Sequence, residues 1–321
     1  MAAASKALDG QLVVLMGGSG FLGQHVAEAL LSRGARVKVV SRRPDKAYRL
    51  KPLANLGQIQ FLRANVANRA ALDGAIRGAD AVVNLVGSFT GNLEQTMGTS
   101  AGWMAEAAAA TGAGAFVHVG AIVPEEHDGI AYARAKRHGE EAVKSAFPQA
   151  TIIRPSLLFG PNGGVTELFA PLIAAFPMLP VFGPEVLVQP TYVVDVAEAI
   201  AHALAHRSEC AGTIFELGGP EQMTMLALNR QIAAAERRKP LLLPMPDSLS
   251  GLFASLPGTP MSRDQWELLK GGNIASGKLP GFRQMGIAPK PMGLFLDGWM
   301  QRYRKNGRFN EPETPSTQAQ Q

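Results

Sequence analysis

The chain has 321 residues, of which 46% are hydrophobic and 18% charged, and its formal net charge is +5. This composition predicts a globular protein with one large α/β domain and a smaller appended one. A single cysteine, Cys210, excludes an internal disulfide and a cysteine-based metal cluster, and it favours a reducing compartment. Because the positive charge forms no lysine-rich block and is not interleaved with aromatic residues, we expect no nucleic-acid partner.

Export and membrane signals are also missing from the sequence. Residues 1–10 lack the apolar core of a signal peptide and the arginine-rich pattern of a transit sequence, so we expect a bacterial cytosolic protein or a processed one. A spanning helix needs about 18 uninterrupted apolar residues. The nearest candidate, residues 168–183, contains Pro171, Pro177 and Pro180 and cannot form one continuous helix.

Residues 12–23, LVVLMGGSGFLG, carry the strongest functional signal. The short apolar run predicts a buried parallel strand that turns sharply into a helix. Gly17 would permit the tight turn, Gly20 would let a diphosphate approach the backbone, and Gly23 would let the helix pack closely on the strand. Such a turn also occurs without a ligand. The helical pattern of residues 24–33 and the next strand at 36–40 nevertheless favour nucleotide binding, with the phosphates at the helix N-terminus. The expected contact residues are Gly17, Gly18, Ser19, Gly20, Phe21, Leu22 and Gly23.

The end of the second predicted strand indicates which nucleotide is bound. A carboxylate at this position would hydrogen-bond the ribose of NAD, but Arg42 and Arg43 stand there instead. A guanidinium group suits a 2′-phosphate, so we predict NADP(H) rather than NAD. The alternative is an ordinary solvated basic turn.

Three further strands are predicted at 59–66, 81–87 and 115–122, with helices at 69–77 and 101–114 between them. Ligands lie at the carboxyl ends of such strands. We therefore expect cofactor contacts from Asn65 and Val66 after the third strand and from Val86 and Gly87 after the fourth, although these are also ordinary turn residues.

Tyr132 and Lys136 open a helix that runs to residue 147. Their spacing of four places both side chains on one helix face. A lysine ammonium beside a phenol favours the phenolate, which would make Tyr132 a general acid or base. The same spacing is common by chance, and its position after the fifth strand of a nucleotide fold strengthens the prediction.

At this point the chain resembles a known superfamily. GGSGFLG at 17–23, the Tyr132 and Lys136 pair, ATIIRPSLLFGP at 150–161 and VQPTYVVDVAEAIAHAL at 188–204 resemble the extended or atypical short-chain dehydrogenases/reductases. More narrowly, these segments with FELGGPE at 215–221 and SRDQWELL at 262–269 are similar to the NADPH-binding accessory subunits of respiratory complex I and their alphaproteobacterial relatives. The resemblance covers residues 12 to about 300.

The resemblance implies roles at the matching positions. The three glycines would hold the diphosphate, Arg42 the 2′-phosphate, Tyr132 and Lys136 the nicotinamide ribose, and the backbone around Pro155 and Ser156 the carboxamide. The chain departs from the pattern at two positions: Asn65 replaces an aspartate near the adenine, and Gly120 stands where active members place a serine. Loss of a hydrogen bond of the serine's kind costs about 2.7 to 4 kcal/mol of transition-state stabilisation. The resemblance therefore implies binding without useful turnover.

These observations predict a doubly wound parallel sheet with a smaller mixed C-terminal domain. We assign residues 1–160 to the NADP(H)-binding Rossmann domain, with 188–210 returning to it, residues 161–305 to a capping or docking domain, and 306–321 to a disordered tail. A short basic amphipathic helix is expected at 295–308. The apolar segments 168–183 and 241–260 form either core or a docking surface for a membrane protein or lipid interface. Glu198, His202 and His206 share a helix face, which we interpret as wetted surface, and we expect no metal.

Three functions stay open. The first is a non-catalytic, NADP(H)-binding accessory or assembly subunit of complex I, in which Tyr132 and Lys136 only bind the cofactor. The second is a catalytic reductase or epimerase that uses both residues. The third is an NADP(H)-sensing regulatory protein. The first implies complex I subunits as partners, no transmembrane segment, and a peripheral position on the cytoplasmic face of the bacterial inner membrane.

Overall fold

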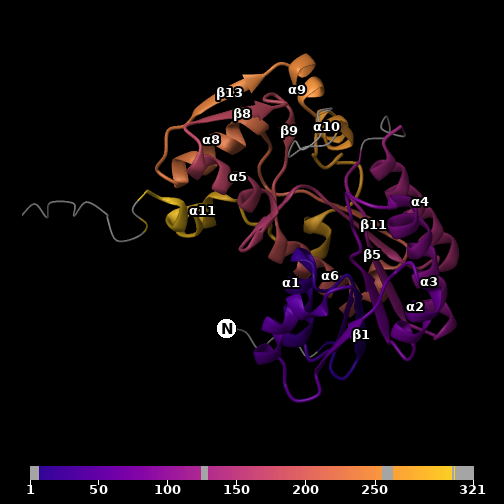
Figure 1. The fold of residues 1–321 in the computed structure, drawn as a ribbon. Coiled ribbons are helices and arrows are strands. Elements are labelled where there is room, and N and C mark those ends of the chain that lie inside the picture. Colours follow the sequence, from indigo (N-terminus) through magenta and orange to yellow (C-terminus); the bar gives the residue numbers. More distant parts are fainter. Residues whose placement is uncertain (1–6, 124–128, 255–262, 306, 308–321) are drawn as a thin grey trace, which may run out of the picture.

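A seven-stranded parallel sheet forms the centre of the computed structural model, which describes residues 7–123, 129–254, 263–305 and 307 (Figure 1). The strand order is β11-β6-β5-β4-β1-β2-β3, so the order reverses between β1 and β4. Such a reversal opens a crevice at the carboxyl ends of the strands, where ligands of doubly wound folds bind. The strands are β1 (Leu12–Met16), β2 (Arg36–Ser41), β3 (Ile59–Arg63), β4 (Ala81–Asn84), β5 (Ala115–Val119), β6 (Thr151–Pro155) and β11 (Ile214–Leu217).

Helices cover both faces of this sheet, which confirms the doubly wound prediction. Side chains on successive strand residues point to opposite faces. In β1, Val13 and Leu15 pack into the core beneath helices α1 (Phe21–Ser32) and α6 (Val193–Ala205). Val14 and Met16 pack into the opposite core, beneath α2 (Arg69–Ile76), α3 (Ser100–Ala110) and α4 (Ala131–Ala146). Both faces of the sheet are therefore buried, as its continuous apolar strands require.

All five strands expected from the sequence are present, but three end earlier than predicted. β3 ends at Arg63, β4 at Asn84 and β5 at Val119. The side chains of Asn65 and Asn84 each accept a hydrogen bond from the backbone two residues on, which turns the chain away from the sheet. Two strands of this sheet, β6 and β11, were not predicted. β11 follows α6 and lies beyond the segment 188–210 that was expected to return to this domain.

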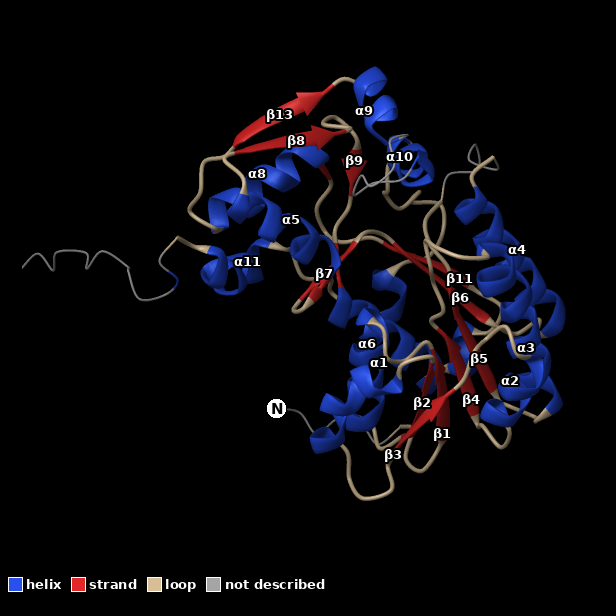
Figure 2. Ribbon diagram, viewed as in Figure 1, coloured by secondary structure: helices blue, strands red, loops and turns tan. Residues whose placement is uncertain are grey.

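The remaining elements gather around a separate apolar core (Figure 2). It is built mainly by α5 (Gly164–Ala175), β8 (Met178–Phe182), α8 (Met225–Ala235), β13 (Leu241–Met245) and α11 (Gly293–Met300). Short strand pairs join β7 (Leu158–Gly160) with β10 (Thr191–Tyr192), and β9 (Leu187–Val188) with β12 (Met223–Thr224). The other helical elements are η1 (Pro44–Leu53), η2 (Glu94–Thr99), α7 (Arg207–Cys210), α9 (Asp247–Ala254), α10 (Arg263–Lys270), η4 (Phe282–Met285) and η5 (Gln301–Tyr303).

The two proline-broken apolar segments contribute both to this core and to the surface. Segment 168–183 is helix to Ala175 and then strand, and β8 pairs with β13 in parallel. Leu179 and Val181 are buried, whereas Met178 and its neighbour Leu241 are half exposed. Residues 255–260 of the second segment lie outside the described residues. No helix in the described part of the chain is long and apolar enough to span a bilayer.

The C-terminal helix begins and ends earlier than expected, since α11 covers 293–300 and is followed by η5. Apart from Gly307, the predicted tail 306–321 lies outside the residues that the structure describes. On α6, Glu198 pairs with Arg33, and the rings of His202 and His206 stack 4.1 Å apart. The carboxylate of Glu198 therefore forms an ion pair that links α6 to α1.

Candidate functional site

The glycine turn between β1 and α1 forms the floor of the crevice. Gly17 has φ +82°, and a Cβ there would lie 3.1 Å from the backbone of Leu85, so this position suits only glycine. A Cβ on Gly23 would lie 2.7 Å from the backbone of Gly18, because the helix packs directly on the turn. At Gly20, by contrast, a Cβ would meet only the carbonyl oxygen of Gly17, at 3.3 Å. The turn is thus tight beneath and open above Gly20, where a diphosphate would approach.

The other residues of the turn hold its shape. A Cβ on Gly18 would come within 2.8 Å of Leu15, and the hydroxyl of Ser19 donates to Ser41 Oγ at 2.8 Å. The ring of Phe21 lies against Gly163, and Leu22 packs on the core under α1. Ser19 and Ser41 together bring the turn beside the end of β2.

Arg42 and Arg43 follow β2 and are both exposed. Arg43 pairs with Asp45 at 3.2 Å, and this hydrogen bond is the main cause that lowers the pKa of Asp45. No ion pair to Arg42 occurs among the described residues. Of the two guanidinium groups, Arg42 is thus the one without an ion pair among the described residues, and its implied contact with a 2′-phosphate stays a prediction.

The ends of β3 and β4 place Asn65, Val66, Val86 and Gly87 at the same edge of the sheet. Asn65 is exposed, and a Cβ on Gly87 would meet no atom within 4 Å, so both border open space. Beneath them lies a pair that the sequence reasoning missed. Asn84 and His118 are 1% and 2% exposed, and their side chains are joined at 3.0 Å. Burial, aided by the charges of Lys136 and Arg154, lowers the pKa of His118 to about 3.

Tyr132 and Lys136 lie one turn apart on α4, as expected, but their side chains are not hydrogen-bonded to each other in the described structure. Lys136 is 5% exposed and donates to the carbonyl oxygen of Val119 at 3.1 Å. The ring of Tyr132 stacks on Phe89, with the centroids 4.6 Å apart. Burial lowers the pKa of Lys136 to about 8 and raises the pKa of Tyr132 to about 12. The structure therefore does not show the expected lowering of the phenol pKa, because burial shifts it in the opposite direction.

A buried ion pair fills the space beside Gly120, just beyond β5. Arg154 donates through Nε and Nη2 to both carboxylate oxygens of Glu140, and Glu140 is 4% exposed. A Cβ on Gly120 would overlap Glu140 Oε1 and approach Arg154 Cγ to 3.3 Å. A serine therefore does not fit here while this pair is intact. Glu140 lies four residues beyond Lys136, so a carboxylate on the same helix face was the available sequence signal.

Pro155 and Ser156 end β6, and their backbone groups already have partners. Ser156 N–H donates to Leu217 O at 3.0 Å, and Pro155 O accepts from Ile122 N at 3.4 Å. The implied contact of the carboxamide with the backbone around Pro155 and Ser156 stays a prediction, and it would have to share or replace these hydrogen bonds. The Ser156 hydroxyl is also engaged, 2.6 Å from Thr191 Oγ1.

Asn273, which sequence reasoning missed, closes the crevice beside β6. Its side-chain oxygen accepts from Leu157 N, and its Nδ2 donates to Ile122 O at 3.1 Å. Its backbone N–H donates to Leu187 O at 2.9 Å, and its carbonyl accepts from Gln189 N at 3.0 Å. One residue thus ties the segments after β5 and β6 to β9.

The fold and this edge define an α/β protein of the doubly wound, Rossmann-like class. A family model described as "NAD dependent epimerase/dehydratase family" matches residues 13–218, and the chain belongs to this family. The match includes the glycine turn, both arginines, and Tyr132 with Lys136.

Individual proteins add detail. The chain is 27% identical over 312 residues to the mitochondrial NADH dehydrogenase (ubiquinone) 1 alpha subcomplex subunit 9 of Rattus norvegicus, covering 93% of this chain and 82% of the rat protein. It is 29% identical to a ceramide reductase of Caulobacter vibrioides, covering 78% and 80%. The crystal structure of Citrobacter sp. triphenylmethane reductase complexed with NADP(H) matches with a TM-score of 0.69 at 15% identity, covering 90% and 99%. This last likeness concerns the fold alone.

Proposed function

We propose that this protein is an NADP(H)-binding, non-catalytic accessory or assembly subunit of respiratory complex I. The observation that carries the proposal is the alignment with a complex I subunit along 93% of the chain. That alignment extends past the nucleotide-binding sheet into the smaller body of the molecule, so it reflects more than a shared cofactor fold.

The residues at the sheet edge fit NADP(H). The open space above Gly20 accommodates a diphosphate at the N-terminus of α1. Arg42 would hold the 2′-phosphate, and Asn65, Val66, Val86 and Gly87 would border the adenosine and the nicotinamide arm. Bound NADP(H) supplies a nicotinamide that can carry hydride. Lys136 would need to leave Val119 O to reach the ribose.

The environment of Gly120 argues against turnover. A hydroxyl that polarises a substrate carbonyl is missing there, and the ion pair of Glu140 and Arg154 occupies the space that it would need. Tyr132, with its pKa raised to about 12, holds its proton at neutral pH, so it is a poor base. These features support a role in holding the cofactor.

The cofactor assignment predicts that NADPH binds at least tenfold more tightly than NADH, a difference of about 1.4 kcal/mol. In Arg42→Ala this preference should fall, because the 2′-phosphate loses its guanidinium partner. Asp45→Asn should strengthen NADPH binding, since it releases Arg43. Calorimetric titration with both nucleotides measures these effects, with Lys46→Ala as a control for net charge. Equal affinities in the wild-type protein, or an unchanged preference in Arg42→Ala, would contradict the assignment.

The partner assignment predicts that the chain is recovered with membranes and comigrates with complex I in blue-native electrophoresis. We propose a peripheral position on the cytoplasmic face of the bacterial inner membrane, with exposed Phe176, Met178 and Leu241 at the docking surface. A Met178→Ser/Leu241→Ser variant should comigrate less while its melting temperature stays unchanged. Leu56→Ser, at an exposed leucine outside the proposed docking surface, is the control. A chain that runs alone while complex I assembles normally without it would refute this role.

A catalytic NADP-dependent reductase is the second candidate. It is supported by the retained Tyr132 and Lys136 and by the 29% identity to a ceramide reductase. NADPH oxidation screened against quinones, ketones and nucleotide sugars distinguishes the two functions. Turnover of about 1 per second or faster that is lost in Tyr132→Phe would favour the enzyme.

A further inference from the structure

The sheet of β8 and β13 lies at the outer margin of the smaller body, away from the crevice (Figure 2). Neither strand contains a polar side chain, since their sequences are MLPVF and LLLPM. Leu179, Val181 and Leu242 pack inward on the core of the smaller body. Because side chains alternate along a strand, Met178 and its partner Leu241 point outward, and they are 50% and 55% exposed. The outer face of this sheet is therefore apolar and open at the start of both strands.

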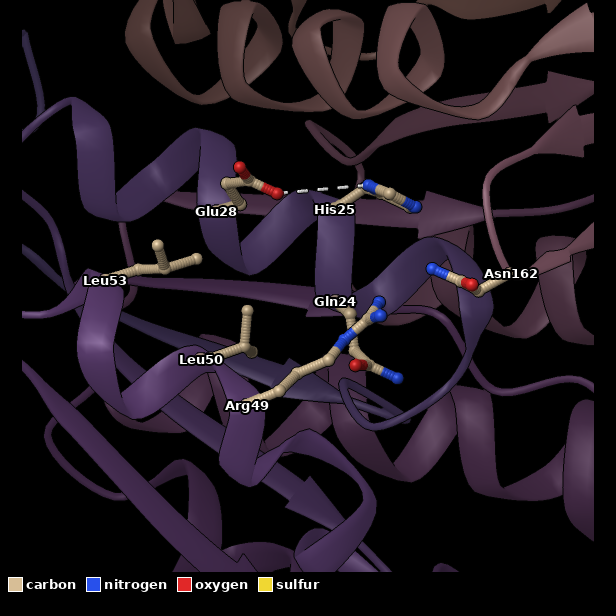
Figure 3. Close-up of a pocket in the computed structure, with 7 residues that line it drawn as sticks. All are labelled: Gln24, His25, Glu28, Arg49, Leu50, Leu53 and Asn162. Atoms are coloured by element: carbon tan, nitrogen blue, oxygen red, sulfur yellow. Dashed lines mark ion pairs between the residues drawn. The ribbon is translucent and has the colours of Figure 1, made fainter. Parts of the chain in front are cut away.

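A basic hollow adjoins the start of β13. It lies at the C-terminal end of α8, and Lys239 and Pro240 lead from it directly into the strand. In the described part of the chain its lining includes no carboxylate but four cations: Arg230, Arg237, Arg238 and Lys239. The cavity between α1 and η1 is different, because Glu28 shares it with His25 and Arg49 (Figure 3). Of these two hollows, the one at α8 carries a single sign of charge.

Carboxylates near the end of α8 do not cancel this charge. Each is matched by an arginine: Glu236 by Arg238, Glu167 by Arg302, and Asp297 by Arg304. Arg230 and Lys239 are exposed and add positive charge beyond these pairs. Two exposed carboxylates, Glu185 and Asp247, follow β8 and β13, but they lie beyond the opposite end of the sheet, about 13 Å or more along the strands. Positive charge and exposed apolar side chains therefore share one corner of the smaller body.

We propose that this corner, formed by Phe176, Met178, Leu241, Arg230 and Lys239, binds the surface of a bilayer that contains anionic lipid. The inference rests on the proposed peripheral position and names its partner. The three apolar side chains, each at least half exposed, would enter the boundary between headgroups and acyl chains. The two cations would lie level with the lipid phosphates, and the negative potential of the leaflet would attract them.

Two features of the corner favour lipid over a protein partner. Pro180 and Pro244 each remove an N–H donor from their strand, so the sheet is a poor template for a strand added by another protein. Lysine is depleted in protein interfaces, whereas at a membrane its long stem lies on apolar groups and its ammonium reaches the phosphates. Lys239, two residues before Leu241, suits the membrane surface.

Flotation of the purified full chain with lipid vesicles tests the proposal. One set of vesicles contains equal parts of phosphatidylglycerol and phosphatidylcholine, and the other contains phosphatidylcholine alone. We expect the chain to bind the anionic vesicles at least tenfold more tightly, and added salt should weaken this binding because it screens the charges. Equal binding to both sets, or binding to neither, would overturn the proposal.

Soluble glycerol phosphate distinguishes a bilayer from a free anion as the ligand. At the same phosphate concentration it should not release the chain from the vesicles, since it offers no apolar phase to Met178 and Leu241. Complete release would assign the hollow to a soluble phosphate compound and would overturn the lipid assignment.

Two double variants locate the surface. Arg230→Gln/Lys239→Gln should bind the anionic vesicles at least fivefold more weakly, because the lipid phosphates lose both cations. Met178→Ser/Leu241→Ser should show a loss of at least the same size, because fewer apolar side chains enter the bilayer. The melting temperatures should stay unchanged, since all four side chains are exposed. Unchanged vesicle binding in either double variant would refute the assignment to this corner.

Two matched controls change the same residue types elsewhere. Arg36→Gln/Arg77→Gln removes exposed cations at β2 and after α2, and Leu53→Ser/Leu56→Ser removes exposed leucines at η1. A loss in either control as large as in its matching variant would also refute the assignment.

Vesicle binding is measured without complex I, so the two proposals fail separately. A chain that comigrates with complex I but binds no vesicles would refute lipid binding alone. A chain that binds vesicles but runs apart from complex I would refute the proposed function alone.

Discussion

Gly120, after β5, stands where the resemblance places a serine in active members. We expect Gly120→Ser to lower the free energy of unfolding by about 3 kcal/mol, because the new side chain displaces Glu140 from Arg154 and leaves a buried charge poorly paired. Turnover should not appear. Urea unfolding measures the loss, and Gly74→Ser, where a Cβ meets open space, is the control. A stable Gly120→Ser protein that reduces carbonyl substrates would show that the ion pair does not block the site.

His118 makes stability depend on pH. Its pKa is about 3 in the folded protein, against 6.5 for an ordinary histidine. The unfolded chain therefore binds more protons between these values, and stability falls as pH drops below about 6.5, by up to about 1.4 kcal/mol per pH unit. We expect His118→Gln to show a shallower loss between about pH 5 and 6.5 than the wild-type protein. Exposed His206, replaced by glutamine, is the control. Parallel stability curves for His118→Gln and wild type would contradict this prediction.

At the scale of elements, Asn273 links the loop that follows α10 to the segments after β5 and β6 through two side-chain hydrogen bonds. Replacing it by alanine leaves Leu157 N–H and Ile122 C=O without partners, at a cost of about 1–3 kcal/mol. Hydrogen exchange should show the Leu157 amide exchanging at least about tenfold faster, while Ser156 N–H, bonded to Leu217 O, stays protected. Asn68→Ala, which removes the N-cap of α2, should leave Leu157 unaffected. An unchanged exchange rate at Leu157 would mean that the hydrogen bond from Leu157 N–H to Asn273 does not limit opening of this segment.

Local patterns were sufficient to predict the elements that bury continuous apolar runs. β1, β2, β4 and β5 were predicted because such runs alternate with helical periodicity. β11 was missed because it has only four residues and contains Glu216, a carboxylate that is 9% exposed and accepts from Ser276 N at 2.7 Å. A charge inside a short strand hides the apolar pattern. The hydrogen-bond donor to Glu216, Ser276 N–H, comes from a segment distant in the sequence, and periodicity cannot reveal such a contact.

At the scale of the whole molecule, the sequence predicted which residues line the sheet edge but not what their neighbours do to them. The residue pattern did not distinguish Arg42 from Arg43, the resemblance implied Arg42, and only the fold shows that Asp45 engages Arg43. The obstruction beside Gly120 arises where α4 and β6 meet, and Asn273 bonds to Leu157 across a sequence separation of 116 residues. Such long-range contacts depend on topology and have no local signature.

The order of strands in the sheet has a consequence for biosynthesis. β6 ends at Pro155, but its outer neighbour β11 begins only at Ile214, after most of the smaller body's first half has been translated. A nascent chain that has just emerged past β6 therefore carries an exposed, apolar strand edge, which invites pairing with other chains. The nucleotide fold is completed late, when β11 covers that edge and Asn273 follows. The sheet therefore cannot be complete before Leu217 has left the ribosome, and until then the edge of β6 depends on other protection against mispairing.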